Sequence, residues 1–150
     1  MVTIRSARLD DLEALVELLK ELFSIEADFS VNDRLQRRGL WMLLENGMGC
    51  LLVAECDGLV VGMVTGQLTV STAEGGPALL VEDMVVSEGY RGRGIGRRLM
   101  GAMAKWAREH HVSRLQLLAD RDNGPALEFY QRLGWHSTQL ICLRKYEAEA

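Results

Sequence analysis

The spacing of hydrophobic positions along the chain changes near residue 50. Before that point, apolar residues recur every three or four positions, and this spacing predicts one helix from about residue 12 to 23 and a second over residues 32–45. Asp10, followed three residues later by Glu13, is typical of a helix N-terminus. A short apolar run over residues 2–5 predicts a strand ahead of both helices.

After residue 50 the pattern favours strands. Apolar runs predict strands over 50–56, 59–70 and 78–86, with a hairpin turn at Asp57-Gly58 and another turn over 74–77. A helix over about 94–110, a buried strand over 115–119, a helix over 123–133 and a final strand over 140–146 follow. Hairpins followed by a β-α-β unit predict a mixed α/β (α+β) fold, whose sheet has helices on both faces.

Length and composition are those of one domain. The 150 residues are 48% hydrophobic and contain no linker-like tract, so we expect a single domain over residues 1–150. The net charge of −4 gives little support for nucleic-acid binding. The first eleven residues carry charges where a signal peptide would be apolar, and no apolar run is long enough to span a membrane. These features favour a cytoplasmic protein without a membrane partner.

The three cysteines show no metal-ligand spacing, and no metal site is expected. Cys50 and Cys56 end one predicted strand, and Cys142 lies within another. We interpret all three as small buried side chains in a reducing compartment.

A glycine-rich segment carries the clearest chemical signal. Residues 90–96 read YRGRGIG and lie between a predicted strand and a predicted helix. Glycines let the backbone approach a bound group closely, and the free N–H groups at a helix N-terminus suit a phosphate. The alternative is a plain tight connection between strand and helix, for which one or two glycines suffice.

Two common phosphate loops do not fit the spacing. A Walker loop requires Gly-Lys-Ser or Gly-Lys-Thr, which this segment lacks. The dinucleotide fingerprint requires a third glycine at its sixth position, and counting from Gly92 that position is Arg97.

A different pattern does match. Arg91-x-x-Gly94-x-Gly96 after the strand LVEDMVV resembles the central motif of the GNAT family of N-acetyltransferases. Residues 123–135, NGPALEFYQRLGW, resemble the second signature of the family, with Trp135 in place of its final Phe. The order of elements fits as well, so the resemblance covers essentially the whole chain. It implies the acyl-CoA N-acyltransferase fold, with two central parallel strands that splay apart.

The resemblance also implies acetyl-CoA as co-substrate and a set of residues that bind it. Backbone groups of the central strand would pair with the pantetheine arm, and the loop would hold the pyrophosphate. The implied coenzyme-binding residues are Met84, Val85, Val86, Arg91, Gly92, Arg93, Gly94, Ile95, Gly96, Arg97, Asn123 and Ala126. Arg93 and Arg97 are equally well read as solvated residues at a helix start, and Asn123 equally well as an ordinary helix N-cap.

Two residues are implied in the chemistry. Tyr130 matches the tyrosine that protonates the departing thiolate in the family, with simple aromatic packing as the alternative. Glu82 matches an acidic position that removes the proton of the acceptor amine, and Asp83 is the second candidate. Strand alternation predicts opposite faces for these two neighbours, and either could simply make a buried hydrogen bond.

The expected activity is direct acetyl transfer to a primary amine, small or peptidic, in a ternary complex. The alternative is a non-catalytic acyl-CoA sensor on the same fold. Glu26, Asp28 and Glu74, with Glu82, predict an acidic rim that favours a cationic acceptor. The apolar strand over 140–146 would be a liability at a bare sheet edge, so we expect a homodimer through this region.

Overall fold

Residues 1–117 form a five-stranded sheet with helices on both faces. The computed structural model describes residues 1–26 and 29–147, which divide into two compact units, Met1–Leu117 and a second that begins at Leu118. The acidic position Asp28 lies outside the described residues.

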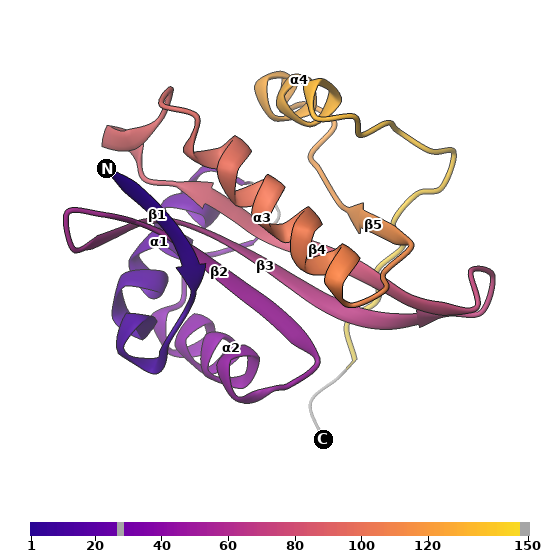
Figure 1. Cartoon of the computed structure of the whole chain (residues 1–150), viewed down its shortest axis with the longest axis horizontal. Helices are drawn as coiled ribbons and strands as arrows, with labels where there is room; N and C mark the ends of the chain where they lie inside the picture. The colour runs from indigo at the N-terminus through magenta and orange to yellow at the C-terminus, as the bar shows by residue number, and fades with distance from the viewer. Residues whose placement is uncertain (27–28, 148–150) are drawn as a thin grey trace. The chain divides into compact units, whose positions relative to one another are not determined.

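The sheet confirms the predicted mixed topology (Figure 1). Its strands are β1 (Val2–Ser6), β2 (Gly49–Cys56), β3 (Leu59–Ser71), β4 (Gly76–Val86) and β5 (Arg114–Leu117), side by side in that order. The first four are antiparallel neighbours, and β4 and β5 are parallel. Asp57 and Gly58 form the predicted hairpin turn. β5 is half-buried rather than buried, because its residues alternate between exposed and intermediate positions.

Three helices and two short 3-10 helices complete the first unit. They are η1 (Leu9–Asp11), α1 (Leu12–Ile25), α2 (Asp33–Glu45), η2 (Glu88–Tyr90) and α3 (Ile95–Glu109). The helix boundaries predicted from the sequence hold within about two residues.

The start of α1 differs in detail from the prediction. Asp11, not Asp10, is the residue before the helix, and its carboxylate accepts a hydrogen bond from Arg8 N at 2.7 Å. The same carboxylate accepts from both terminal nitrogens of Arg5, at 2.8 and 3.0 Å. These hydrogen bonds, that of Arg5 foremost, hold the pKa of Asp11 below its usual value. Glu13 instead pairs with a residue of α2.

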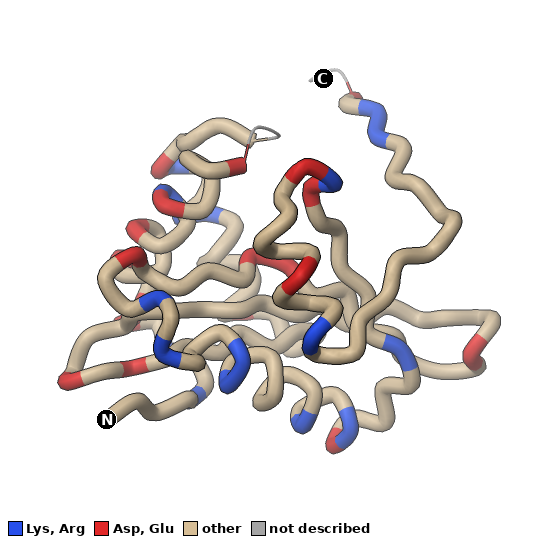
Figure 2. The backbone as a smooth tube through the Cα atoms, turned by 90° about the horizontal axis from the view of Figure 1, so that it is seen from above, with Lys and Arg blue, Asp and Glu red and all other residues tan. Residues whose placement is uncertain are grey.

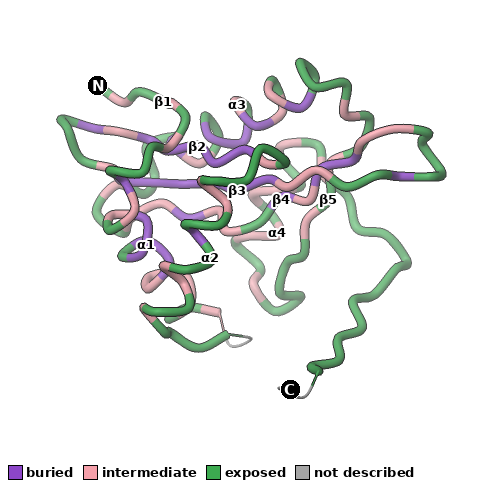
Figure 3. Tube along the Cα trace, turned by 90° about the horizontal axis from the view of Figure 1, so that it is seen from below, coloured by how far each residue is buried: buried purple, intermediate pink, exposed green. Residues whose placement is uncertain are grey.

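The core has one layer on each face of the sheet. Figure 3 shows the buried residues along the central strands, with α3 on one side and α1 and α2 on the other. On the α1 side the core cluster comprises Leu15, Val16, Leu18, Leu19, Leu40, Leu51, Val53, Met63 and Val85. Because strand side chains alternate between faces, the residues between these strand positions face α3.

Glycines in β3 allow α3 to pack closely on the sheet. A Cβ atom at Gly62 would lie 3.1 Å from Leu99 Cδ1, and one at Gly66 would lie 3.0 Å from Met103 Sδ. Leu99 and Met103 are fully buried on α3. The middle of α3 therefore packs closely against β3.

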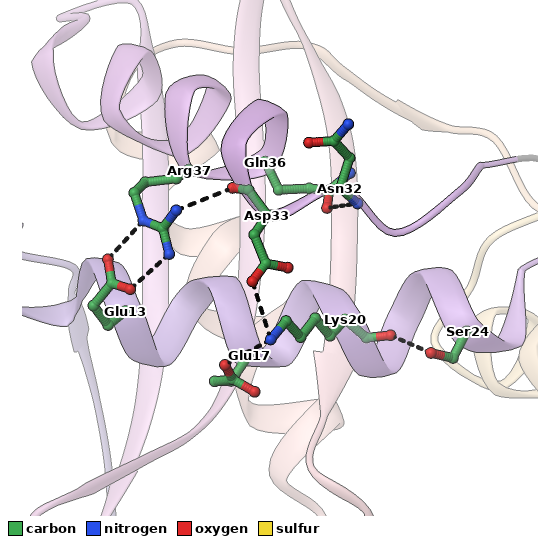
Figure 4. Close-up of polar contacts among 8 residues, drawn as sticks. All are labelled: Glu13, Glu17, Lys20, Ser24, Asn32, Asp33, Gln36 and Arg37. Atoms are coloured by element: carbon green, nitrogen blue, oxygen red, sulfur yellow. Dashed lines mark hydrogen bonds and ion pairs between the residues drawn. The ribbon is translucent and has the colours of Figure 1, made fainter.

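Ion pairs join α1 to α2 on their outer surface (Figure 4). Arg37 donates two hydrogen bonds of 2.8 Å to the carboxylate of Glu13. Lys20 lies 3.1 Å from Glu17 and 3.2 Å from Asp33. The side chain of Asn32 accepts from Leu35 N and caps α2. These contacts fix how the two helices face each other.

The second unit contains one helix, α4 (Gly124–Arg132), among its described residues. The predicted final strand over 140–146 is wrong, because these residues have neither helix nor strand structure. Leu140, Ile141 and Leu143 are 82%, 72% and 87% exposed, and Cys142 is exposed as well, whereas we expected it to be buried. An apolar run forms a strand only where a neighbouring strand offers backbone partners, and among the described residues no strand pairs with this one.

Among the described residues, no helix combines the length and the apolar character needed to cross a bilayer.

Candidate functional site

The parallel strands β4 and β5 separate halfway along β4. Their register runs from Ala78 opposite Arg114 to Val81 opposite Leu117, where β5 ends. β4 continues to Val86, still paired with β3 on its other side. Within the first unit, the last five residues of β4 therefore have an unpaired edge, as expected for splayed central strands.

The ladder with β3 determines which backbone groups point to this edge. Ser87 N donates to Val61 O at 2.8 Å, and Met63 pairs with Val85 two residues along. Hydrogen-bonded pairs alternate along an antiparallel ladder, so the backbone of Val85 faces β3 while that of Met84 and Val86 faces away. Met84 thus presents its N–H and C=O groups at the open edge and Val86 its N–H group, while Val86 O accepts from Arg91 Nε. Val85 contributes its side chain to the core.

The glycine-rich loop begins where this edge ends. Gly92 and Gly94 have φ angles of 77° and 78°, which residues other than glycine rarely adopt. Gly94 is the residue before α3, and no side chain caps that helix. The first N–H groups of α3, those of Ile95, Gly96 and Arg97, therefore point out of the helix with the positive end of its dipole.

The arginines around the loop mostly bind the protein itself. Figure 2 shows Lys and Arg following one another along this loop and α3. Arg91 Nε donates to Val86 O at 2.8 Å, and Arg98 donates to Val2 O at 2.7 Å. Arg93 donates to Gly89 O at 3.2 Å and lies over the ring of Tyr90. All four arginines are exposed, and three of them, Arg91, Arg93 and Arg98, donate to backbone carbonyls of the protein.

A β-bulge interrupts β4 just after it leaves β5. Met63 pairs with Val85 but Thr65 pairs with Glu82, so two residues of β4 lie opposite one residue of β3. Asp83, in the bulge, has a φ of 49°, a left-handed conformation that Asp tolerates better than most residues.

The bulge overturns the predicted alternation of Glu82 and Asp83. Glu82 is the register partner of Thr65, and Asp83 lies 3.5 Å from the hydroxyl of the same Thr65. Both carboxylates therefore belong to the face of the sheet that carries α1. Glu82 is exposed, whereas Asp83 is half-buried above Thr65, which is completely buried.

Burial raises the pKa of Asp83 to about 6, and the nearby charges of Glu82 and Glu26 act in the same direction. The hydrogen bond from Thr65 acts in the opposite direction but is weaker. A carboxyl group with this pKa exchanges protons readily near neutral pH. It can therefore take a proton from a bound ammonium group.

The expected acidic rim is smaller than predicted. Glu26 follows the last residue of α1, and its charge acts on Asp83. Glu74 lies in the turn between β3 and β4 and pairs with Arg114 at 3.6 Å. The strand from Gly76, where β4 begins, to Glu82 spans about 20 Å, at roughly 3.3 Å per residue. Glu74 therefore belongs to a different part of the sheet.

The second unit holds the remaining predicted residues. The side chain of Asn123 accepts from Ala126 N at 3.2 Å and caps α4, as the N-cap interpretation predicts. Tyr130 packs against Phe129 and Trp135, with ring centroids 5.2 and 6.0 Å apart. These contacts orient the phenol of Tyr130 within its own unit.

The cysteines do not offer an alternative nucleophile on this face. Burial raises the pKa of the Cys50 thiol to about 12, which disfavours the reactive thiolate at neutral pH. Cys56 is buried as well. Among the described residues, no group of three or more His, Cys, Asp or Glu is placed to hold a metal ion.

Sequence reasoning missed two residues near this edge. Thr65 shows no signal in the sequence, because it lies within an ordinary apolar strand. Glu21 of α1 accepts a hydrogen bond from Glu88 N at 3.0 Å, a contact between residues 67 positions apart. The open edge of β4 and the uncapped start of α3 offer backbone donors for an anion. The carboxylates of Glu82 and Asp83 offer a proton acceptor.

Comparison with known proteins places this arrangement in context. The sequence model described as "Acetyltransferase (GNAT) family" matches residues 12–135. A protein named streptothricin acetyltransferase, from Streptomyces lavendulae, is 39% identical over 74 residues, 49% of this chain and 39% of that protein. The chain spans less than two thirds of the length of the first curated relatives that it matches.

Solved structures share the fold. A possible acetyltransferase from Clostridium difficile 630 superposes with a TM-score of 0.87 at 20% identity, over 100% of this chain and 99% of that one. A predicted acetyltransferase from Clostridium acetobutylicum, solved with acetyl-CoA, gives a TM-score of 0.78 at 20% identity, with 96% of each chain covered. At these identities the likeness concerns the fold.

The raised pKa of Asp83 predicts a pH-dependent stability. Between about pH 4 and 6 Asp83 keeps its proton in the folded state, whereas in the unfolded chain, with an ordinary Asp pKa of 3.8, it has released it. The free energy of unfolding therefore falls as the pH rises through this range. Asp83→Asn removes this cost and also tolerates the positive φ. We expect the variant to be more stable than the wild type by roughly 1–3 kcal/mol at pH 8, and no more stable at pH 4.

Urea unfolding at the two pH values measures this difference, with Asp10→Asn, at an exposed position, as the control. An Asp83→Asn variant whose stability differs from the wild type equally at both pH values would contradict the assignment.

Proposed function

Since the chain belongs to the acetyltransferase (GNAT) family, we propose that it is an N-acetyltransferase that moves the acetyl group of acetyl-CoA to a primary amine. The transfer is direct, with coenzyme and amine bound together. The observation that carries the proposal is the open edge of β4 running into the uncapped N-terminus of α3.

The residues at this edge fit the coenzyme chemically. Its pantetheine arm carries amide groups, which match the outward backbone groups of Met84 and Val86. Its pyrophosphate matches the N–H groups of the loop over residues 91–97. A Cβ atom at Gly92 or Gly94 would meet no protein atom within 4 Å, so the space beside the loop is open to a ligand. When bound, acetyl-CoA supplies an activated acetyl thioester.

The proposed proton transfers use groups of this chain. Glu82, directly or through a water, takes the proton that the ammonium form of the acceptor must lose before it attacks. Asp83 is the second candidate, because it lies on the same face and titrates near neutral pH. The hydroxyl of Tyr130 gives a proton to the departing sulfur.

The proposed acceptor is a cationic amine. Glu26, Glu82 and Asp83 place negative charge on the α1 side of β4, which favours a positively charged substrate. The relative named streptothricin acetyltransferase makes streptothricin one member of a test panel, beside polyamines, aminoglycosides, amino acids and peptides.

We also propose a homodimer in which the segment over residues 140–146 contributes to the interface. Support comes from the exposed apolar side chains of Leu140, Ile141 and Leu143, which are rare on a monomer surface when they follow one another.

Coenzyme binding depends on the loop glycines. Replacing Gly94 with Val forces a β-branched side chain into φ 78° and places bulk where the pyrophosphate is expected. We expect at least a 100-fold weaker affinity for coenzyme A by calorimetry, in a protein that still folds. Gly101→Ala, on an exposed part of α3 with open space around it, is the control and keeps wild-type affinity. A folded Gly94→Val variant with unchanged affinity would refute the loop assignment.

Kinetic measurements distinguish the proposed roles of Tyr130 and Glu82. Tyr130→Phe should lower kcat roughly 10–1000-fold with little change in coenzyme affinity, since the phenol acts only on the leaving thiolate. Glu82→Gln should flatten the alkaline rise of the pH–rate profile. Release of thiol from acetyl-CoA across the amine panel measures both. If Glu82→Gln retains the wild-type pH–rate profile and Asp83→Asn loses it, the base is Asp83. If the wild type binds acetyl-CoA but turns over none of the amines, a sensor function is supported instead.

The dimer is tested by sedimentation at micromolar concentration. We expect a species of about twice the 16.7 kDa chain mass, and its conversion to monomer by Leu143→Glu, which places a charge in the apolar segment. Val70→Glu, at an exposed position of β3, should leave the dimer intact. A wild-type monomer would rule out this assembly.

A further inference from the structure

The short helix η2, between β4 and the glycine-rich loop, is held at its start by a residue from α1. Ser87 precedes η2 but makes no side-chain cap. Instead, Glu21 Oε1 accepts a hydrogen bond of 3.0 Å from Glu88 N, the first N–H group of η2. A carboxylate that accepts from the start of a helix is a charge-assisted cap, and this one comes from 67 residues away.

The same carboxylate reaches the other end of η2. Arg91 follows η2, and its terminal nitrogen lies 3.7 Å from Glu21 Oε1. Arg91 Nε donates to Val86 O at 2.8 Å, at the open edge of β4. Glu21, Arg91 and Val86 therefore form a continuous chain of contacts from α1 to the end of β4.

We propose that Glu21 is a positioning residue for coenzyme binding: it holds η2 and Arg91 so that the loop and the carbonyl of Val86 keep the arrangement the coenzyme requires. This inference rests on the proposed function. Gly92 and Gly94, which follow Arg91, have the wide conformational freedom of glycine, so the position of the loop depends on the side chains that flank them. An anchor outside the loop supplies that constraint.

A purely stabilising role fits these contacts less well. The side chains of Glu21 and Arg91 are 35% and 43% exposed, and exposed ion pairs add little to stability. The pair can still matter for the position of the loop, since small displacements of binding groups have large effects on the affinity for a ligand. Loss of Glu21 should therefore weaken coenzyme binding clearly while changing the melting temperature little.

The variants Glu21→Ala and Glu21→Gln test the proposal. Alanine favours the helix, so α1 is retained, while glutamine keeps an oxygen that can accept from Glu88 N. Glu17→Ala is the matched control, one turn earlier on α1, where Glu17 pairs with Lys20 and Lys20 keeps Asp33. The readouts are the Kd for coenzyme A by calorimetry, amide exchange at Glu88, and KM and kcat with acetyl-CoA.

We expect Glu21→Ala to raise the Kd roughly 10-fold and to accelerate exchange at Glu88, with Glu21→Gln in between and Glu17→Ala unchanged. KM for acetyl-CoA should rise more than kcat falls. If the wild type binds coenzyme A and Glu21→Ala binds equally well, or Glu17→Ala loses as much affinity, the positioning role is wrong and the proposed function stands. If the wild type itself fails to bind coenzyme A, the proposed function fails, and this inference fails with it.

Discussion

The separation of β4 from β5 is the constraint on which the rest of the site depends. Parallel pairing stops after Val81, and the bulge at Asp83 follows within two residues. Had pairing continued, the outward backbone groups of Met84 and Val86 would be satisfied by β5, and nothing would remain for a ligand to pair with. Because pairing stops, β4 has an unpaired edge within the first unit, and η2 and the glycine-rich loop connect its end to the uncapped start of α3. The bulge, which lies within this unpaired stretch of β4, brings two carboxylates to one face.

Much of this could be predicted from the sequence. The change of hydrophobic period near residue 50 gave the order of helices and strands in the first unit, and the glycine spacing identified the loop with its positive φ angles at Gly92 and Gly94. Signals of this kind are local: they depend on neighbours within a few positions. The matching family model confirms the resemblance drawn from the two motifs, one at residues 91–96 and the other at residues 123–135.

What could not be predicted depends on pairing between distant segments. Alternation assigned opposite faces to Glu82 and Asp83, but the extra residue opposite Val64 is a property of the β3–β4 register and leaves no trace in β4 alone. The run over residues 140–146 has strand-like composition but no paired neighbour. The contact of Glu21 with Glu88 spans 67 positions. Three of the arginines around the loop, Arg91, Arg93 and Arg98, donate to backbone carbonyls. Each of these outcomes was decided by tertiary contacts rather than by local propensity.

Coenzyme A is proposed to bind at the unpaired edge of β4 and the loop after it. The most direct measurement is a titration of the isotopically labelled protein with coenzyme A, followed through its backbone amide resonances. We expect saturable shifts centred on Met84, Val86 and the amides of residues 92–97, with the turn between β3 and β4, at the far end of β4, unaffected. Saturable shifts that leave these amides unchanged and cluster elsewhere, for example around Asn46, Cys50 and Trp106 in the small pocket between α2, β2 and α3, would contradict it.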